Sequence, residues 1–165
     1  MLKSFFVCNI LSIVYYISFC QNTVFTSLDE AVKHPDSVIN LVLKKQKIKV
    51  FPIEILNMKN IERLDLSRNS IKEIPAEIKN LKRLHYLNLA QNYLSSLPKE
   101  LSELPLDTLI LWDNQIREFD KSFRNTNLRF LDLRAILMTR KEQEAIKQTF
   151  PNAKIKKDNA CNCGR

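Results

Sequence analysis

Residue types that carry out catalysis are few in this chain and lie far apart. The two histidines are His34, next to a proline, and His85, which lies fifty-one residues further along the chain. Nucleophilic catalysis needs a hydroxyl or thiol, a histidine base and an acid within reach of one another, and no such set can be assembled here. Asp65 and Asp132 fall on the same face of the predicted sheet but three strands apart, so they form no acid pair. We therefore expect no catalytic residues and no enzymatic activity.

Glycine is almost absent, which excludes several classes of enzyme. Gly164 is the only glycine in 165 residues, and it lies in the tail. Phosphate-binding loops, dinucleotide-binding turns and nucleophile elbows all need glycine where the backbone turns tightly. We therefore exclude nucleotide-dependent enzymes and expect no cofactor.

The cysteines lie at the two ends of the chain and indicate no metal site. Cys8 and Cys20 belong to the first twenty residues, and Cys161 and Cys163 to the last five. Two cysteines one residue apart would form a strained ring if bridged, and no nearby histidine or cysteine completes a tetrahedral site. Two interpretations remain for Cys161 and Cys163: free thiols on a frayed terminus, or an intermolecular disulfide in an oxidising compartment.

The centre of the chain repeats one pattern. Ile61–Arg83 reads IERLDLSRNSIKEIPAEIKNLKR, and Leu84–Pro105 reads LHYLNLAQNYLSSLPKELSELP. The two leucines of each L-x-L are two positions apart, so both point to one face of a strand. The same phase extends in both directions, and successive units begin at Val38, Ile61, Leu84, Leu106 and Leu128. A short, fixed period of this kind predicts a solenoid.

The pattern L-x-x-L-x-L-x-x-N-x-L resembles the leucine-rich repeat family. This resemblance implies an α/β fold, a right-handed solenoid with a parallel concave sheet and about five repeats. It also implies that Asn69, Asn92 and Asn114 bond backbone groups of adjacent turns. The segments P-x-E-I/L-x-x-L are similar to those of short bacterial repeat proteins, which bind other macromolecules through the concave face and carry no chemistry.

The ends of the array carry helix-start signals, which predict helical caps over the exposed ends of the core. Ser27 with Glu30, and Thr139 with Glu142, match capping boxes. We expect a last short edge strand over residues 153–155. The predicted organisation is a signal peptide (1–20), a flexible lead-in and N-terminal helical cap (21–37), repeats (38–138), a C-terminal helical cap (139–155) and a flexible tail (156–165).

The first twenty residues are typical of an export signal. Lys3 is their only charge. The apolar run Phe5–Phe19 is shorter than a transmembrane helix requires and has the length found in signal peptides. Ser18 and Cys20 fit cleavage before Gln21, giving a protein that is secreted or lies in the periplasm or cell envelope. The alternative is an outer-membrane lipoprotein with Cys20 lipidated, although the bulky residue ahead of it argues against this route.

Side chains between the core leucines point outward from the predicted sheet and form three columns. The columns are Asn40, Arg63, Tyr86, Thr108 and Phe130; Val42, Asp65, Asn88, Ile110 and Asp132; and Lys44, Ser67, Ala90, Trp112 and Arg134. Tyr86, Ile110, Trp112 and Phe130 fall within three adjacent strands, and exposed apolar and aromatic clusters commonly mark contact sites. The alternative is that these rings pack on one another or under the C-terminal segment. The predicted binding residues are Arg63, Asp65, Tyr86, Asn88, Ile110, Trp112, Phe130, Asp132 and Arg134.

The charge adds a second hypothesis about the partner. The formal net charge is +8, with clusters at Lys44, Lys45, Lys47 and Lys49 and at Lys154, Lys156 and Lys157. A basic protein outside the cell favours acidic partners through long-range attraction. We expect a protein or peptide ligand, with an anionic glycan or a surface-structural role as the alternative. We expect no nucleic acid, and membrane attachment only if Cys20 is lipidated.

Overall fold

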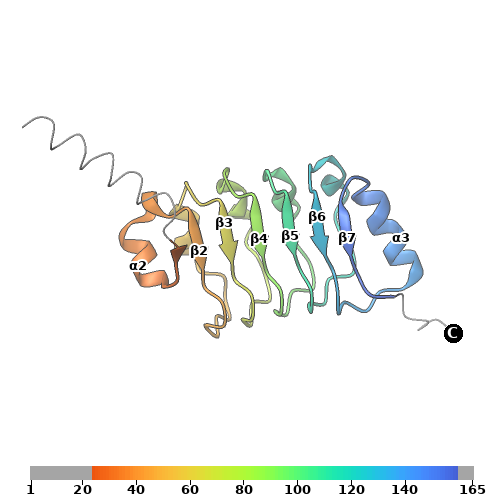
Figure 1. Cartoon of the computed structure of the whole chain (residues 1–165), viewed down its shortest axis with the longest axis horizontal. Helices are drawn as coiled ribbons and strands as arrows, with labels where there is room; N and C mark the ends of the chain where they lie inside the picture. Colours follow the sequence, from red (N-terminus) through yellow and green to blue (C-terminus); the bar gives the residue numbers. More distant parts are fainter. Residues whose placement is uncertain (1–23, 160–165) are drawn as a thin grey trace, which may run out of the picture.

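A computed structural model of the chain describes residues 24–159, in which strands and short helices alternate (Figure 1). The strands are β1 (Val24–Phe25), β2 (Asn40–Val42), β3 (Arg63–Asp65), β4 (Tyr86–Asn88), β5 (Thr108–Ile110), β6 (Phe130–Asp132) and β7 (Lys154–Lys156). The α-helices are α2 (Leu28–Lys33) and α3 (Arg140–Thr149). The 3-10 helices are η1 (Pro35–Ser37), η2 (Ile53–Asn57), η3 (Ala76–Asn80), η4 (Lys99–Glu103) and η5 (Lys121–Asn125).

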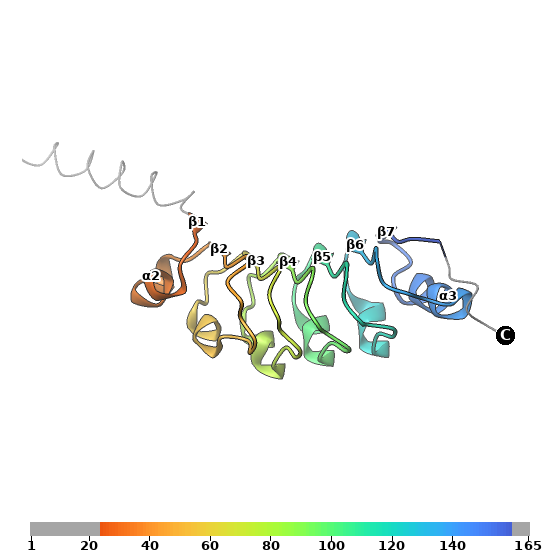
Figure 2. The same ribbon diagram turned by 90° about the horizontal axis from the view of Figure 1, so that it is seen from below.

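The seven strands within residues 24–159 form one open parallel sheet, ordered β1 to β7 as in the sequence. Leu64 of β3 pairs with Leu41 of β2 and with Leu87 of β4, so equivalent positions of successive repeats stand side by side. This register confirms the α/β fold with a parallel sheet. Figure 2 shows the strands along the inner side of a shallow arc and the 3-10 helices along the outer side. Neighbouring strands are about 4.8 Å apart and helices need more room, which bends the stack toward the strands.

The core lies between the strands and the 3-10 helices, and the repeated leucines fill it. Leu64, Leu66, Leu87 and Leu89 have no exposed surface, as the L-x-L spacing predicts. Each buried leucine contributes about 2 kcal/mol of transfer free energy relative to an exposed one. Because neighbouring repeats share this core, a single repeat would leave half of its apolar face in water.

Asparagines close the turns of the second, third and fourth repeats, as the resemblance implied. The Asn92 side-chain carbonyl accepts from the Ile71 N–H at 3.0 Å, and its amide donates to the carbonyls of Leu66 and Leu89 at 3.0 Å each. Asn69 and Asn114 bond backbone groups of their own and the preceding repeat in the same way. These side chains therefore link adjacent repeats through hydrogen bonds to buried backbone groups, which an apolar residue could not make.

Each repeat has a residue with a positive φ directly after the outward-facing segment, and the first repeat has a second one at Lys47. The recurring residues are Lys45, Arg68, Gln91, Asp113 and Ala135, and all six have φ between 55° and 61°. Left-handed backbone costs roughly 1–2 kcal/mol in a residue other than glycine. The near absence of glycine thus leaves a small, recurring strain that the stacked hydrogen bonds offset.

The outer helices start in two ways. Pro52, Pro75 and Pro98 precede η2, η3 and η4, and each has the backbone φ that the proline ring imposes. Asp120 takes this place before η5, and its carboxylate accepts from the Ser122 N–H at 2.8 Å. Hydrogen bonds to Ser122 hold the pKa of Asp120 below its usual value. The departure from proline in the fourth repeat is therefore compensated by a side-chain cap.

The N-terminal end departs from the prediction at two points. Val24 and Phe25 form β1 beside Asn40 and Leu41, so these residues are an edge strand and not a flexible lead-in. The pairing is favourable because it satisfies the open edge of β2 with a β-branched and an aromatic residue. At α2, the Ser27 side chain accepts from the Glu30 N–H at 3.5 Å, but the Glu30 carboxylate bonds Lys33 at 2.7 Å instead of completing the capping box.

The C-terminal end agrees more closely with the prediction. Thr139 and Glu142 form a complete capping box at the start of α3, and β7 follows as the expected edge strand. The predicted flexible tail is wrong for residues 156–159. The Asp158 carboxylate accepts from the Ala135 N–H at 2.5 Å, and Lys157 bonds the buried side chain of Gln143.

Several predictions fall on residues that the structure does not describe, or on roles that it does not test. The signal peptide (1–20), the fate of Cys20 and the pair Cys161 and Cys163 lie outside the described residues. The role of α2 and α3 as caps of the solenoid also stays a prediction. In residues 24–159, no helix has the length and apolar character needed to cross a membrane.

Candidate binding surface on the strand face

The register places the predicted binding residues where the repeat pattern puts them. Arg63, Tyr86, Thr108 and Phe130 pair in one row across β3 to β6, and Asp65, Asn88, Ile110 and Asp132 pair in the next. Trp112 follows β5, where its carbonyl accepts from the Gln91 N–H at 2.9 Å, so the row beyond the strands is also in register. The three predicted columns are therefore in register along the strand face, whose strands are visible along the inner side of the arc in Figure 2. In the third column, however, Ser67 and Ala90 are buried, so the prediction that they are exposed is wrong.

Four of the residues form what we call the aromatic cluster: Tyr86, Ile110, Trp112 and Phe130. All four are half-buried, so part of each side chain stays accessible. Their side chains lie on the opposite face of the sheet from the leucine core, as the alternation of a strand requires. The cluster therefore combines ordered rings with accessible apolar surface, a combination found at the centres of protein interfaces.

Cations border the aromatic cluster on both sides. The Arg63 guanidinium lies over the Tyr86 ring, 4.0 Å from its centroid, and the Lys156 ammonium lies 5.5 Å from the centroid of Phe130. Such contacts orient long, flexible side chains and leave their donors free for a ligand. Lys154 and Lys156 pair with Phe130 and Asp132 in the sheet, and the predicted set omitted both. The edge strand was expected over residues 153–155, which includes Lys154, whereas Lys156 was assigned to the flexible tail. The alternation of lysine and isoleucine in Lys154-Ile155-Lys156 was the signal that could have found both lysines.

The polar members of the predicted set act mainly on the backbone around them. Asp65 accepts from the Ser67 N–H at 2.8 Å and from the Asn88 amide at 3.0 Å, while Asn88 accepts from the Ala90 N–H at 3.1 Å. The two bonds to backbone N–H groups hold the chain where it leaves the strand, and the third joins the side chains of neighbouring strands. Asp65 and Asn88 remain half-buried on the surface, so they shape the site besides lining it.

Asp132 differs from the prediction in its accessibility. Only 3% of its surface is exposed, and both carboxylate oxygens accept from Arg134, at 2.9 Å and 2.7 Å for the shortest contacts. A buried carboxylate held in this bidentate way offers little to a ligand. Its role in the structure is to orient Arg134, whose side chain is 50% exposed.

A hollow of about 310 Å³ lies beside the aromatic cluster, toward the N-terminal end of the sheet. Its lining residues are Val24, Asn40, Leu41, Val42, Arg63, Asp65 and Tyr86. Burial raises the pKa of the Tyr86 phenol, and the negative charge of Asp65 raises it further, so this hydroxyl stays protonated at neutral pH. The side-chain carbonyl oxygen of Asn40 is buried there without a hydrogen-bond partner among residues 24–159. The hollow is thus lined by the Tyr86 side chain next to the apolar rings, whereas the Asn40 oxygen is itself covered.

Groups that could bind a metal do not converge anywhere in the described part of the chain. No group of three or more His, Cys, Asp and Glu residues with the arrangement of a metal site occurs within residues 24–159. His85 is exposed, and its ring nitrogen lies 2.6 Å from the Arg83 carbonyl. The features of the strand face that a ligand could contact are therefore its shape, its aromatic rings and its charged side chains.

Comparison with known proteins gives the family. A sequence profile described as "Leucine rich repeat" matches residues 36–94 and, in a second overlapping position, residues 60–116. The stacked L-x-L strands and buried asparagines lie within these residues. The repeats of this chain belong to the leucine-rich repeat family. No match is found among curated protein sequences.

Solved structures include several leucine-rich repeat proteins similar to this one. A leucine-rich repeat protein of Leptospira interrogans is 26% identical, with a TM-score of 0.56, over 81% of this chain and 40% of that one. TLR13, solved in complex with ssRNA13, is 28% identical, with a TM-score of 0.65, over 82% of this chain and 20% of that one. An internalin (inlF) of Listeria monocytogenes shares the fold at 18% identity, with a TM-score of 0.61, over 81% and 40% of the two chains. This leucine-rich repeat chain thus spans less than half the length of each.

Proposed function

We propose that this leucine-rich repeat chain is a non-catalytic binding module that recognises a protein or peptide through its strand face. The aromatic cluster is the observation that carries this proposal. Tyr86, Ile110 and Phe130 lie in register on three adjacent strands, Trp112 follows β5, and all four keep part of their surface open. Arg63 and Arg134 stand at its borders with oriented guanidinium groups, and aromatic residues and arginine are the types that dominate binding free energy at interfaces.

Relatives of the same fold support a binding role without naming the ligand. The leucine-rich repeat fold is commonly a protein-interaction module, and the family is generally not enzymatic. A plant peptide hormone receptor, RGFR1, was solved in complex with RGF2, and TLR13 with ssRNA13. Among these ligands a peptide fits this chain best, because base stacking with phosphate contacts would call for cations along the whole face. Asp65 and the tied Arg134–Asp132 pair lie within that face instead.

An anionic glycan is the second candidate, and one observation favours it. Lys154 and Lys156 extend the strand face beyond Phe130, and Lys156 lies over that ring. A sugar stacked on Phe130 or Trp112 would bring its anionic groups near these ammonium groups. Charge-led binding of this kind weakens steeply with salt, while contacts with the aromatic cluster are screened much less.

We also propose that the chain acts outside the cytoplasm, either secreted or in the cell envelope. The charge-poor apolar run at Phe5–Phe19 and the small residues Ser18 and Cys20 support export with cleavage before Gln21. Mass spectrometry of the exported protein tests this: a mature chain that begins at Gln21 agrees with it, and a lipid on Cys20 would instead place the protein on a membrane.

Trp112→Ala tests the binding proposal. The immobilised mature protein is exposed to an extract of extracellular and envelope proteins, and retained partners are measured at low and high salt. We expect Trp112→Ala to weaken retention at least about tenfold, since truncating a central aromatic costs about 2 kcal/mol or more. The melting temperature should change little because the ring faces away from the leucine core.

Tyr93→Ala is the matched control, because Tyr93 is an aromatic residue that is 54% exposed and lies outside the three columns. It should leave retention unchanged. Equal loss in both variants, or a large fall in melting temperature with Trp112→Ala, would show that Trp112 serves packing. Retention that disappears at high salt in the parent and reappears on a sulfated glycan column would favour the glycan.

A further inference from the structure

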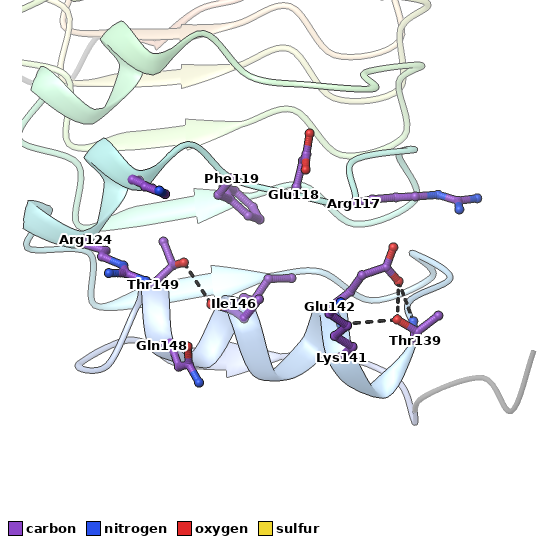
Figure 3. Close-up of a pocket in the computed structure, with 12 residues that line it drawn as sticks. Arg117, Glu118, Phe119, Arg124, Thr139, Lys141, Glu142, Ile146, Gln148 and Thr149 are labelled. Carbon is purple, nitrogen blue, oxygen red and sulfur yellow. Dashed lines mark hydrogen bonds between the residues drawn. The ribbon is translucent and has the colours of Figure 1, made fainter. Parts of the chain in front are cut away.

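A second concave site lies away from the strand face. It is a groove of about 490 Å³ between α3 and the segment that leads into η5, shown in Figure 3. Its lining residues are Arg117, Glu118, Phe119, Lys121, Arg124, Thr139, Lys141, Glu142, Ala145, Ile146, Gln148 and Thr149. Arg117, Glu118 and Phe119 precede η5, Lys121 and Arg124 lie in η5, and the remaining residues are Thr139, which caps α3, and residues of α3 itself. The groove is therefore independent of the aromatic cluster and of the function proposed for it.

The floor of the groove is apolar and held in place by ring packing. Phe119 is half-buried and packs edge-on against Phe123 and Phe150, with ring centroids 5.6 Å and 5.0 Å apart. Ile146 of α3 lies opposite and is buried, while Ala145 is exposed. Figure 3 shows Phe119 and Ile146 near the middle of the groove. An apolar side chain of a ligand could bury itself here without a rearrangement of the floor.

Unpaired positive charge surrounds this floor. Arg117, Lys121, Arg124 and Lys141 are all exposed, and within residues 24–159 none of their side chains forms an ion pair or a hydrogen bond. Of the two acids in the lining, Glu142 is already engaged: it accepts from the Thr139 N–H at 2.6 Å and from the Thr139 hydroxyl at 2.8 Å. The other acid, Glu118, is exposed, and the lining still holds four cations against two acids. The groove is therefore complementary to a ligand that carries more than one negative charge.

The placement of the cations distinguishes between kinds of anionic ligand. Figure 3 shows Arg117 toward the Thr139 end of α3 and Arg124 toward the Thr149 end, with the apolar floor between them. A fatty acid or similar amphiphile has one charged head and would use the cations of one end only. Carboxylates on both sides of an apolar residue would use both ends. A helix of this length extends about 15 Å, which corresponds to roughly four or five residues of extended peptide.

We propose that this groove binds an extended acidic peptide segment of a partner protein, with an apolar residue on Phe119 and Ile146 and carboxylates at both ends. The arginines supply bidentate contacts to the carboxylates. Docking here leaves the strand face free, so the chain can hold two partners, or two parts of one partner, at once.

The probe is a fluorescein-labelled peptide, Asp-Glu-Leu-Glu-Asp, and binding is measured by fluorescence anisotropy in about 150 mM salt, where long-range charge effects are screened beyond roughly 8 Å. We expect saturable binding. The double variant Arg117→Glu, Arg124→Glu should weaken it at least about tenfold, because it reverses the charge at both ends of the groove. The double variant Lys72→Glu, Lys79→Glu is the matched control, since it makes the same change in net charge at exposed positions outside the groove. It should alter the affinity less than about twofold.

Two further variants test the floor. Ala145→Trp fills the groove from an exposed position on α3 and should abolish binding, whereas Lys147→Trp on the same helix should not. Replacing leucine in the peptide by glycine should weaken binding as well. Melting curves of all variants establish that each is folded.

Three outcomes would overturn the proposal. Absence of binding at about 1 mM peptide, the weakest affinity of interest, is the first. Equal weakening by the two double variants is the second, because it would show diffuse attraction by net charge. The third is tighter binding of dodecanoate than of the peptide, with displacement of the peptide, which would assign the groove to an anionic amphiphile.

Discussion

Single asparagines decide whether adjacent repeats stay joined. Asn92 binds one N–H and three carbonyls of the second and third repeats, and its own surface is only 5% exposed. Alanine at this position would leave those backbone groups without partners in a place that water reaches poorly. The free energy involved is that of leaving buried polar groups unsatisfied, about 1–3 kcal/mol.

We therefore expect Asn92→Ala to lower the free energy of unfolding by about 2 kcal/mol, measured by urea denaturation. Asn80→Ala is the control, since Asn80 is an exposed asparagine in η3. It should change the stability by less than about 0.5 kcal/mol. Equal stability of the two variants would contradict the role of the buried asparagine ladder.

The strands and their register were predictable from the sequence because one spacing determines them. Leucines two apart define the buried face, the same spacing recurs in every repeat, and the outward columns follow with no further assumption. The columns through Tyr86 and Phe130 were therefore found correctly. β1 was not, because Val24 and Phe25 carry no repeat and gain their place only by pairing with β2.

Other features could not be predicted, because they depend on contacts between side chains that the spacing of residues in the sequence does not reveal. Asp132 occupies a column position like that of Asp65, yet the neighbouring Arg134 and the C-terminal edge leave it buried. The placement of residues 156–159 depends on the buried amide of Gln143, which needs polar partners. The groove at α3 combines residues from two elements whose contact becomes visible only in three dimensions.

At the scale of elements, the start of α3 depends on one carboxylate. The N–H and hydroxyl of Thr139 donate to Glu142, and these bonds, with a smaller effect of the Arg117 charge, hold the pKa of Glu142 below its ordinary value of 4.5. A carboxyl whose pKa is lower in the folded state stabilises the fold above its unfolded pKa. This contribution is lost as the pH falls through the folded pKa.

We expect the melting temperature of the parent to fall as the pH drops below about 4.5, the ordinary glutamate pKa, and Glu142→Gln to show less of this fall. Glu142→Gln should be less stable than the parent at neutral pH, with the difference shrinking in acid. Glu144→Gln, an exposed position on the same helix, is the control and should follow the parent. Parallel pH profiles for the parent and Glu142→Gln would show that the capping box carries no pH dependence.

At the scale of the whole molecule, a solenoid differs from a closed globular domain because its hydrophobic core is exposed at each end unless a cap covers it. The last repeat carries Leu131 and Leu133, which are buried, and the residues of α3 and its C-terminal end that share this core are Ile146 and Phe150. At the other end, Ala31 of α2 is buried in the same core. This arrangement is what the predicted caps require, and it makes their function testable by detaching one of them.

Phe150→Asp places a charge in the ring cluster with Phe119 and Phe123, where Phe150 is only 4% exposed. An unpaired charge costs several kcal/mol in such a position, more than the contacts of one short helix supply, so α3 should leave the core. The exposed end of the last repeat is then an apolar surface beside a sheet edge, and such surfaces associate. We expect the variant to show concentration-dependent association in sedimentation velocity at concentrations where the parent does not change, together with lower helix content in circular dichroism.

Lys147→Asp adds the same side chain at an exposed position of α3 and should behave like the parent. A Phe150→Asp variant that loses helix content but keeps the sedimentation behaviour of the parent would show that α3 is not needed to cap the array.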